Sequence, residues 1–114
     1  MICTTSKFWE AFFDPTNPDN KKANKNLISY DQEKIIIPES VLTEVSSWLI
    51  RNKKSEINSW FIDYACYTSN VRIFIFTKSE IEEIGKISIQ IGVSFSDASV
   101  SYLQKKLLCD VAEF

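Results

Sequence analysis

The hydrophobic pattern at the start of the chain predicts a short strand followed by a helix. Residues 1–4 are short and β-prone, and they come directly before Thr5 or Ser6, either of which can cap the N-terminus of a helix. Aromatic residues then recur at helical spacing as far as Asp14-Pro15. The helix ends there because the residue before a proline avoids the α region.

Continuous apolar runs alternate with amphipathic segments along the rest of the chain. The isoleucines at residues 35–37 and the apolar residues 71–76 suit strands that are buried on both faces. A polar loop at residues 16–25, leading into a short helix around residues 22–30, precedes the first of these runs. Between and after the runs, apolar residues recur every three or four positions, which predicts helices. The four helices are expected to begin at Pro38, Ser55, Thr77 and Ser94.

Capping signals mark the limits of the last two helices. Thr77 and Glu80 match a capping box, in which each side chain accepts a hydrogen bond from the other residue's backbone amide. Gly92 then stops this helix, whose inner face is expected to carry isoleucines 81, 84, 87 and 91. Ser94 with Asp97 opens the last helix.

Strands that alternate with helices of this length predict an α/β fold with a central parallel sheet covered on both sides. A further strand is expected to begin at Val111. We found neither an internal repeat nor a low-complexity linker, so residues 1–114 are expected to form one domain. In sheets of this kind ligands collect beyond the carboxyl ends of the strands, and we looked for chemistry there.

Composition and charge narrow the classes of function. The chain is 45% hydrophobic and 25% charged, which is typical of a globular protein. Its net charge of -2 means that RNA would have to bind at a local basic cluster or through bound cations. There is no histidine, and the three cysteines are scattered, which excludes a Cys/His zinc site and histidine-based catalysis. Each cysteine is expected to pack as a small buried hydrophobe. Neither a membrane span nor a signal peptide is predicted, which indicates a cytoplasmic protein.

Three residues lie where a parallel sheet places its ligands. Thr4 ends the first strand, Glu44 flanks the apolar stripe of the second-strand helix, and Asp97 lies in the first turn of the last helix. A carboxylate cluster in such a crevice would bind Mg²⁺ or Mn²⁺, which prefer oxygen ligands. Each acid also has a simpler explanation, since Glu44 suits a solvated boundary position and Asp97 favours a helix N-terminus. Spacing alone therefore leaves both interpretations open.

Three blocks of the sequence resemble consecutive parts of PIN-domain ribonucleases. The first block, ICTTSKFWEAF, resembles the first strand and helix of that family. The second, IIIPESVLTEVSSWL, is similar to the second strand and helix and places the acid of that helix at Glu44. The third, GVSFSDASVSYLQKKLLCDVAEF, resembles the last region and places another acid at Asp97. Toxins of the VapC type are the nearest sub-group in size.

The resemblance implies a three-layer α/β/α fold and an endoribonuclease in which Glu44 and Asp97 hold Mg²⁺ or Mn²⁺. Ser6 would orient the site. The metal would activate water and neutralise charge on the scissile phosphate. The family also implies the toxin of a type II toxin–antitoxin pair, with RNA as substrate, a small antitoxin over the crevice and a homodimer.

The departures from the family predict a weakened site. Thr4 stands where the family carries its first Asp, and it would contribute at most a hydroxyl or a water-mediated contact. The fourth acid usually follows a pair that corresponds here to Glu113 and Phe114, so the family's last strand or helix is expected to be missing. Fewer carboxylates compensate less for the dehydration of the cation. Weak or absent cleavage is therefore expected.

Two other functions stay open. A non-catalytic module could keep the fold in order to bind a partner protein or RNA, which the missing acids favour. A different doubly wound domain, such as a phosphorelay receiver, needs an acidic pair after its first strand, which this sequence does not have.

Overall fold

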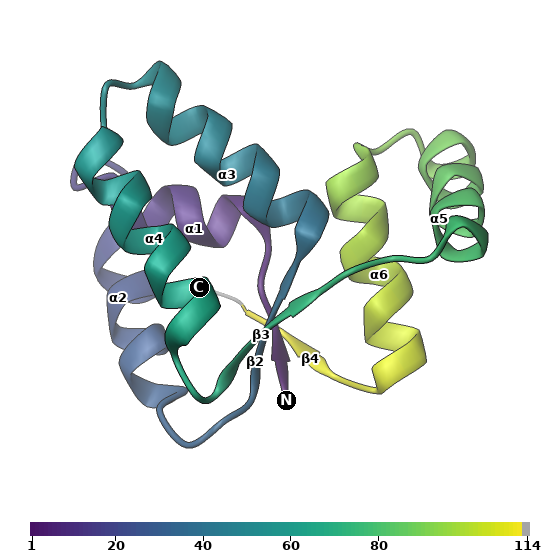
Figure 1. Ribbon diagram of the computed structural model, residues 1–114, viewed down its shortest axis with the longest axis horizontal. Coiled ribbons are helices and arrows are strands. Elements are labelled where there is room, and N and C mark those ends of the chain that lie inside the picture. The colour runs from purple at the N-terminus through teal and green to yellow at the C-terminus, as the bar shows by residue number, and fades with distance from the viewer. Residues whose placement is uncertain (113–114) are drawn as a thin grey trace.

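The computed structural model describes residues 1–112 and places a parallel sheet between helices (Figure 1). The four strands are β1 (Ile2–Cys3), β2 (Ile35–Pro38), β3 (Val71–Phe74) and β4 (Asp110–Val111). The helices are α1 (Ser6–Phe13), α2 (Asn20–Ser29), α3 (Glu39–Arg51), α4 (Ser55–Tyr67), α5 (Lys78–Ile91) and α6 (Phe95–Leu107). The strand order is β3-β2-β1-β4, and every pairing is parallel. The predicted α/β class with a central parallel sheet is confirmed.

The helices cover the sheet from both sides. Figure 1 shows α1, α2 and α4 to one side of the strands and α5 and α6 to the other. Helix α3 contacts helices of both groups, since it packs against α1, α4 and α6. It therefore borders any crevice that opens between the two groups above the carboxyl end of β2.

The two predicted apolar strands differ in burial because they occupy different places in the sheet. The isoleucines of β2, a central strand, are at most 1% exposed, as expected for a strand that is covered on both faces. Strand β3 lies at the edge and is only half-buried. It ends at Phe74, two residues before the predicted end, and Ile75 is 70% exposed. The prediction of a second fully buried strand over residues 71–76 was therefore wrong.

Several helix boundaries also differ from the predicted ones. Pro38 is the last residue of β2 and the N-cap of α3, not the first helical residue. Ser55 begins α4, but no side chain caps that helix. Helix α2 begins at Asn20, two residues before the predicted start, and Asn20 Nδ2 donates to the carbonyl of Ala11. The capping box of Thr77 and the stop at Gly92 are confirmed.

Helix α5 buries much less of its apolar face than its sequence predicts. Of the four predicted inner isoleucines, Ile84 is fully buried, whereas Ile81 is 47% and Ile91 is 64% exposed. The reason is that α5 packs mainly on α6 and lies to the side of the sheet (Figure 1). Periodicity identified the helix correctly, but it could not show how much of the apolar face a neighbour would cover.

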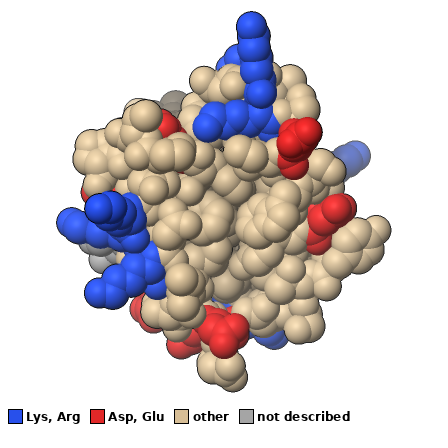
Figure 2. Space-filling model, turned by 90° about the vertical axis from the view of Figure 1, so that its left-hand side faces the viewer, with Lys and Arg blue, Asp and Glu red and all other residues tan. Residues whose placement is uncertain are grey.

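Aromatic rings join α1 to α4 on the opposite side of the molecule. Phe12 and Trp60 are stacked with ring centroids 6.2 Å apart, and Trp60 is stacked on Tyr64 at 5.1 Å. Trp60 is 47% exposed, so this stack reaches the surface. Figure 2 shows the face on the left-hand side of Figure 1, where a broad uncharged area has Lys and Arg along some of its edges and Asp and Glu along others. We call Phe12, Trp60 and Tyr64 the aromatic face.

The cysteines do not all behave as predicted. Cys3 and Cys109 are buried, but Cys66 is exposed on α4, so it does not pack as a core residue. Burial raises the pKa of the Cys3 thiol to about 12, and the neighbouring Cys109 adds to the effect. No helix among residues 1–112 has the length and apolar character needed to cross a membrane.

Candidate functional site

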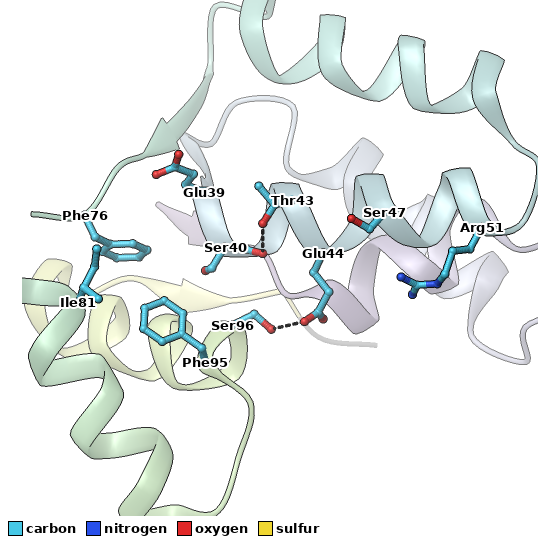
Figure 3. Close-up of a pocket in the computed structure, with 10 residues that line it drawn as sticks. All are labelled: Glu39, Ser40, Thr43, Glu44, Ser47, Arg51, Phe76, Ile81, Phe95 and Ser96. Carbon is cyan, nitrogen blue, oxygen red and sulfur yellow. Dashed lines mark hydrogen bonds between the residues drawn. The ribbon is translucent and has the colours of Figure 1, made fainter. Parts of the chain in front are cut away.

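A cleft of about 600 Å³ runs along one face of α3. Figure 3 shows Arg51 toward one end of the cleft, Glu44 and Ser96 in its middle, and Phe76, Ile81 and Phe95 at the other end. It is bounded by α3 on one side and by α5, α6 and the segment before α5 on the other. Because α3 follows directly from β2, the cleft opens at the carboxyl edge of the sheet, as predicted for a ligand site.

Glu44 is held in the middle of the cleft from a second helix. Its Oε2 accepts a hydrogen bond of 2.9 Å from Ser96 Oγ, and Ser96 is only 4% exposed. Ser96 lies in the first turn of α6, so this bond connects α3 to the N-terminus of α6 (Figure 3). Glu44 itself is exposed, which leaves its carboxylate accessible from the cleft.

Asp97 lies next to Ser96 in the first turn of α6. Its backbone N–H donates to the N-cap hydroxyl of Ser94, which confirms the predicted start of this helix. The Asp97 side chain is exposed, and within residues 1–112 its carboxylate takes part in no hydrogen bond or ion pair. The cap therefore uses the backbone of Asp97 and leaves its carboxylate free for other chemistry.

A third acid, Glu10 of α1, belongs to the same electrostatic environment. Partial burial raises the pKa of its carboxyl, and the negative charges of Glu44 and then Asp97 raise it further. The positive charges of Arg51 and Lys7 act in the opposite direction. The charges of carboxylates on α3 and α6 therefore act on a carboxyl of α1, although α1 and α6 are far apart in sequence. Sequence analysis missed Glu10, and the only signal for it was its position one turn after Ser6.

The hydroxyl of Thr4 is engaged by a backbone carbonyl and by an indole N–H. Thr4 is fully buried, and its Oγ1 donates to the carbonyl of Ile36 at 3.1 Å and accepts from Trp9 Nε1 at 2.8 Å. These two bonds fix the end of β1 to β2 and to α1. The expected hydroxyl contact from Thr4 to a metal or its water would require this arrangement to rearrange.

The hydroxyl of Ser6 differs from that of Thr4 in its hydrogen bonding. It is 4% exposed, and its Oγ has no hydrogen-bond partner within the described part of the chain. A buried hydroxyl without a partner is destabilising by about 1–3 kcal/mol, so such groups are usually satisfied by water or a ligand. Ser6 precedes Glu10 by four residues on α1, which places both on the same side of the helix.

The carboxylates of this region suit a divalent cation that keeps several waters better than one that is bound by protein ligands alone. Among residues 1–112, no three Cys, Asp or Glu side chains come together as a metal-holding group. Mg²⁺, however, commonly keeps several waters and binds through one or two carboxylates. Glu44 and Asp97 stay the predicted pair; Glu44 lines the cleft, and Asp97 follows Ser96, the hydrogen-bond partner of Glu44. Glu113 and Phe114, beside the expected position of the fourth family acid, lie outside the described residues.

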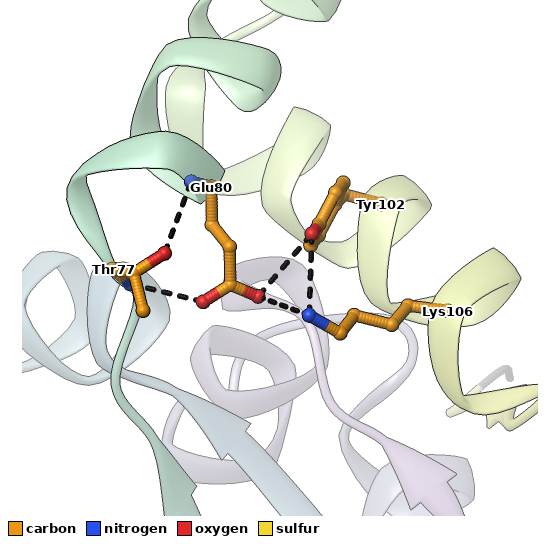
Figure 4. A network of polar contacts seen from close by, with 4 residues as sticks. All are labelled: Thr77, Glu80, Tyr102 and Lys106. Atoms are coloured by element: carbon orange, nitrogen blue, oxygen red, sulfur yellow. Dashed lines mark hydrogen bonds and ion pairs between the residues drawn. The ribbon is translucent and has the colours of Figure 1, made fainter.

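The α5 wall of the cleft is fixed to α6 by a polar network (Figure 4). Glu80 Oε2 accepts from Lys106 Nζ at 2.7 Å and from Tyr102 Oη at 3.2 Å. The bond to Lys106 and the capping interaction with Thr77 lower the pKa of Glu80 to about 2. Ile81, the next residue, lines the cleft, so the network helps to position that wall.

The strand order β3-β2-β1-β4, with helices on both sides of the sheet, gives the chain the same fold as a solved VapC toxin. The solved structure of VapC20 from Mycobacterium tuberculosis, a toxin that cleaves the sarcin–ricin loop, matches it with a TM-score of 0.87. The match covers 100% of this chain and 89% of VapC20 at 18% sequence identity. No protein-family model and no curated protein sequence matches the chain. The resemblance to PIN domains is thus confirmed by structure, at an identity that establishes the fold alone.

Proposed function

We propose that this protein is a PIN-type endoribonuclease that acts as the toxin of a toxin–antitoxin pair in the cytoplasm. The observation that carries the proposal is the position of Glu44 in a cleft on the carboxyl edge of the sheet, where it is bonded to Ser96, the residue before Asp97. The fold of VapC20, a toxin that cleaves the sarcin–ricin loop, supports the same conclusion. RNA is the proposed substrate.

Glu44 and Asp97 would hold Mg²⁺ or Mn²⁺ in the proposed site. The bound cation would supply an activated water and would neutralise charge on the scissile phosphate. Ser96 keeps one oxygen of Glu44 in place, and the unpartnered Ser6 hydroxyl can hydrogen-bond to a water at the site. Glu10 would supply part of the negative charge that is missing at Thr4.

Cleavage is expected to be weaker than in a site that has its full set of acids. Thr4 brings no charge, and its hydroxyl is occupied by Ile36 and Trp9. We therefore assign Thr4 a structural role in place of the direct contact predicted from sequence. Glu10 compensates only in part, because it lies on α1 and is not among the residues that line the cleft.

A non-catalytic binding module is the second candidate. The absence of any three-carboxylate metal group among residues 1–112 favours it. Such a module would keep the cleft for an RNA or a protein partner without cleaving it.

Two protein partners are part of the proposal. An antitoxin segment would cover the cleft, and Glu39 and Glu44 on its wall would attract a basic side chain. A second copy of the chain would bind at the aromatic face, where Trp60 is partly exposed. Aromatic side chains of this kind bury large areas and are enriched at protein interfaces.

The deciding experiment is RNA cleavage by the purified chain in Mn²⁺ or Mg²⁺, with a sarcin–ricin loop hairpin and a mixed RNA as substrates. Asp97→Asn and Glu10→Gln remove one acid each, and Asp63→Asn, an exposed acid on α4, is the matched control. A nuclease should lose activity in Asp97→Asn, lose part of it in Glu10→Gln and keep it in Asp63→Asn.

Other outcomes have equally definite meanings. Cleavage that appears only in Thr4→Asp would identify a disabled nuclease on an intact scaffold. RNA binding without cleavage in any variant would favour the binding module. Cleavage that persists unchanged in Asp97→Asn would show that the nuclease activity does not come from this site.

A further inference from the structure

The cleft continues beyond the acids to a small apolar recess formed by Phe76, Ile81 and Phe95. The three side chains come from the segment before α5, from α5 and from α6, and they gather at one end of the cleft (Figure 3). Phe76 and Phe95 are half-buried, and Ile81 is 47% exposed. The recess is therefore accessible from solvent at Ile81 and Phe95, whereas Phe76 packs against the core and contacts the Phe74 ring.

The position of the recess relative to the acids is fixed by the chain itself. Phe95 directly precedes Ser96, which bonds to Glu44, and Asp97 follows immediately. All three residues lie in the first turn of α6. A group held against the Phe95 ring would consequently lie near Glu44, the hydrogen-bond partner of the next residue, Ser96.

Helix α3 extends along the cleft from the recess to the positively charged Arg51. Ser40 and Arg51, both lining residues, are eleven residues apart on α3, or about 16 Å along the helix axis. Within residues 1–112 the Arg51 guanidinium makes no hydrogen bond or ion pair, so it can bind a phosphate. Glu44 lies between Arg51 and the recess (Figure 3).

We propose that the recess of Phe76, Ile81 and Phe95 is a base-binding subsite. It takes the unstacked base of a nucleotide adjacent to the phosphate that lies at the acids, while Arg51 binds a phosphate on the other side. This inference rests on the proposed function, because it needs single-stranded RNA in the cleft. Half-exposed aromatic rings beside a groove that tracks a backbone are the usual platform for bases in single-stranded RNA.

An RNA base fits this arrangement better than an aliphatic side chain for a physical reason. The recess offers the ring faces or edges of two phenylalanines to one occupant, and stacking gives a flat base more contact there than a branched chain would have. The whole cleft, with a volume of about 600 Å³, is in the range of sites that enclose a small ligand. Binding of a partner's apolar side chain is the competing outcome of the test.

The test compares RNA with a polyanion that has no bases. Fluorescein-labelled rA5, rC5 and rU5 and inorganic polyphosphate are titrated into the full chain in Mg²⁺ and followed by anisotropy. Phe95→Ala is compared with Phe95→Leu, which keeps apolar volume but loses the ring. Ile89→Ala is the control, because Ile89 is exposed on α5 and does not line the cleft. Thermal unfolding of each variant checks that it is folded.

Phe95→Ala should weaken binding of at least one pentanucleotide about 5- to 150-fold, the value of one stacked base, and leave polyphosphate binding unchanged. Phe95→Leu should lie between Phe95→Ala and the parent, and Ile89→Ala should match the parent. In the parent, the ¹³C-methyl NMR signal of Ile81, assigned with Ile81→Val, should show a ring-current shift with RNA but not with polyphosphate.

Three results would overturn the inference. Equal weakening of RNA and polyphosphate binding in Phe95→Ala would mean that the ring does not bind bases. RNA binding without a shift of the Ile81 signal would place the bases elsewhere while leaving the nuclease proposal intact. A shift produced by a Leu- and Arg-containing peptide but not by RNA would assign the recess to a protein partner. Failure of every RNA to bind or to be cleaved would remove both the subsite and the proposed function.

Discussion

Replacing Thr4 by valine tests whether this residue is a structural link or part of the site. The substitution keeps the shape of the side chain and removes its hydroxyl. The carbonyl of Ile36 still accepts a bond of 2.9 Å from the backbone N–H of residue 4, so it stays satisfied. The indole N–H of Trp9 loses its partner, and Trp9 is fully buried.

The expected loss of stability follows from that indole. A buried donor left without a partner is destabilising by about 1–3 kcal/mol, and we expect about 2 kcal/mol for Thr4→Val. With an unfolding entropy near 2.1 cal/mol/K per residue, a loss of this size lowers Tm by about 8 °C for a chain of this length. Thermal unfolding followed by tryptophan fluorescence or near-UV circular dichroism measures it.

Two controls separate the hydrogen bond from packing. Thr4→Ser keeps the hydroxyl and loses one methyl group, so it should be destabilised by only about 1 kcal/mol. In a Trp9→Phe background the indole is absent, and Thr4→Val should then be destabilising by much less than in the parent. Equal stability of Thr4→Val and Thr4→Ser, or an unchanged effect of Thr4→Val in the Trp9→Phe background, would refute the structural role.

Three further predictions concern ionisation and thiol chemistry. Because the pKa of Glu80 is depressed to about 2, its stabilising contribution is present above about pH 4.5 and is lost as the pH falls toward 2. Unfolding curves across this range should show the loss, and Lys106→Met should reduce it. Because the pKa of Glu10 is raised, its ionised form opposes folding at neutral pH, so Glu10→Gln should raise Tm at pH 7. The same variant should show a smaller rise of Tm on addition of Mn²⁺, and an equal rise would place the cation elsewhere. In the native protein a thiol reagent should label Cys66 quickly, whereas Cys3, with a pKa of about 12, should react only on unfolding, as mass spectrometry can show.

Local signals in the sequence were enough to predict most of the elements and their order. Strand β2 follows from three consecutive isoleucines, and the start of α5 follows from the Thr77 capping box. These features depend on residues within one turn or one strand of each other, so they can be recognised without knowing the fold. A ligand site at the carboxyl edge of a parallel sheet was also predicted, and the cleft with Glu44 lies there.

Only the tertiary structure decided which of these residues meet and which surfaces are covered. It brought Glu10 of α1 into the environment of Glu44, and it satisfied the Thr4 hydroxyl with a carbonyl of the next strand and an indole of α1. It also left much of the apolar face of α5 exposed, because that helix packs mainly on α6. Periodicity identifies the residues that share a helix face. The neighbour of that face, and the charges opposite it, depend on how elements distant in sequence pack, and the local pattern does not contain this information.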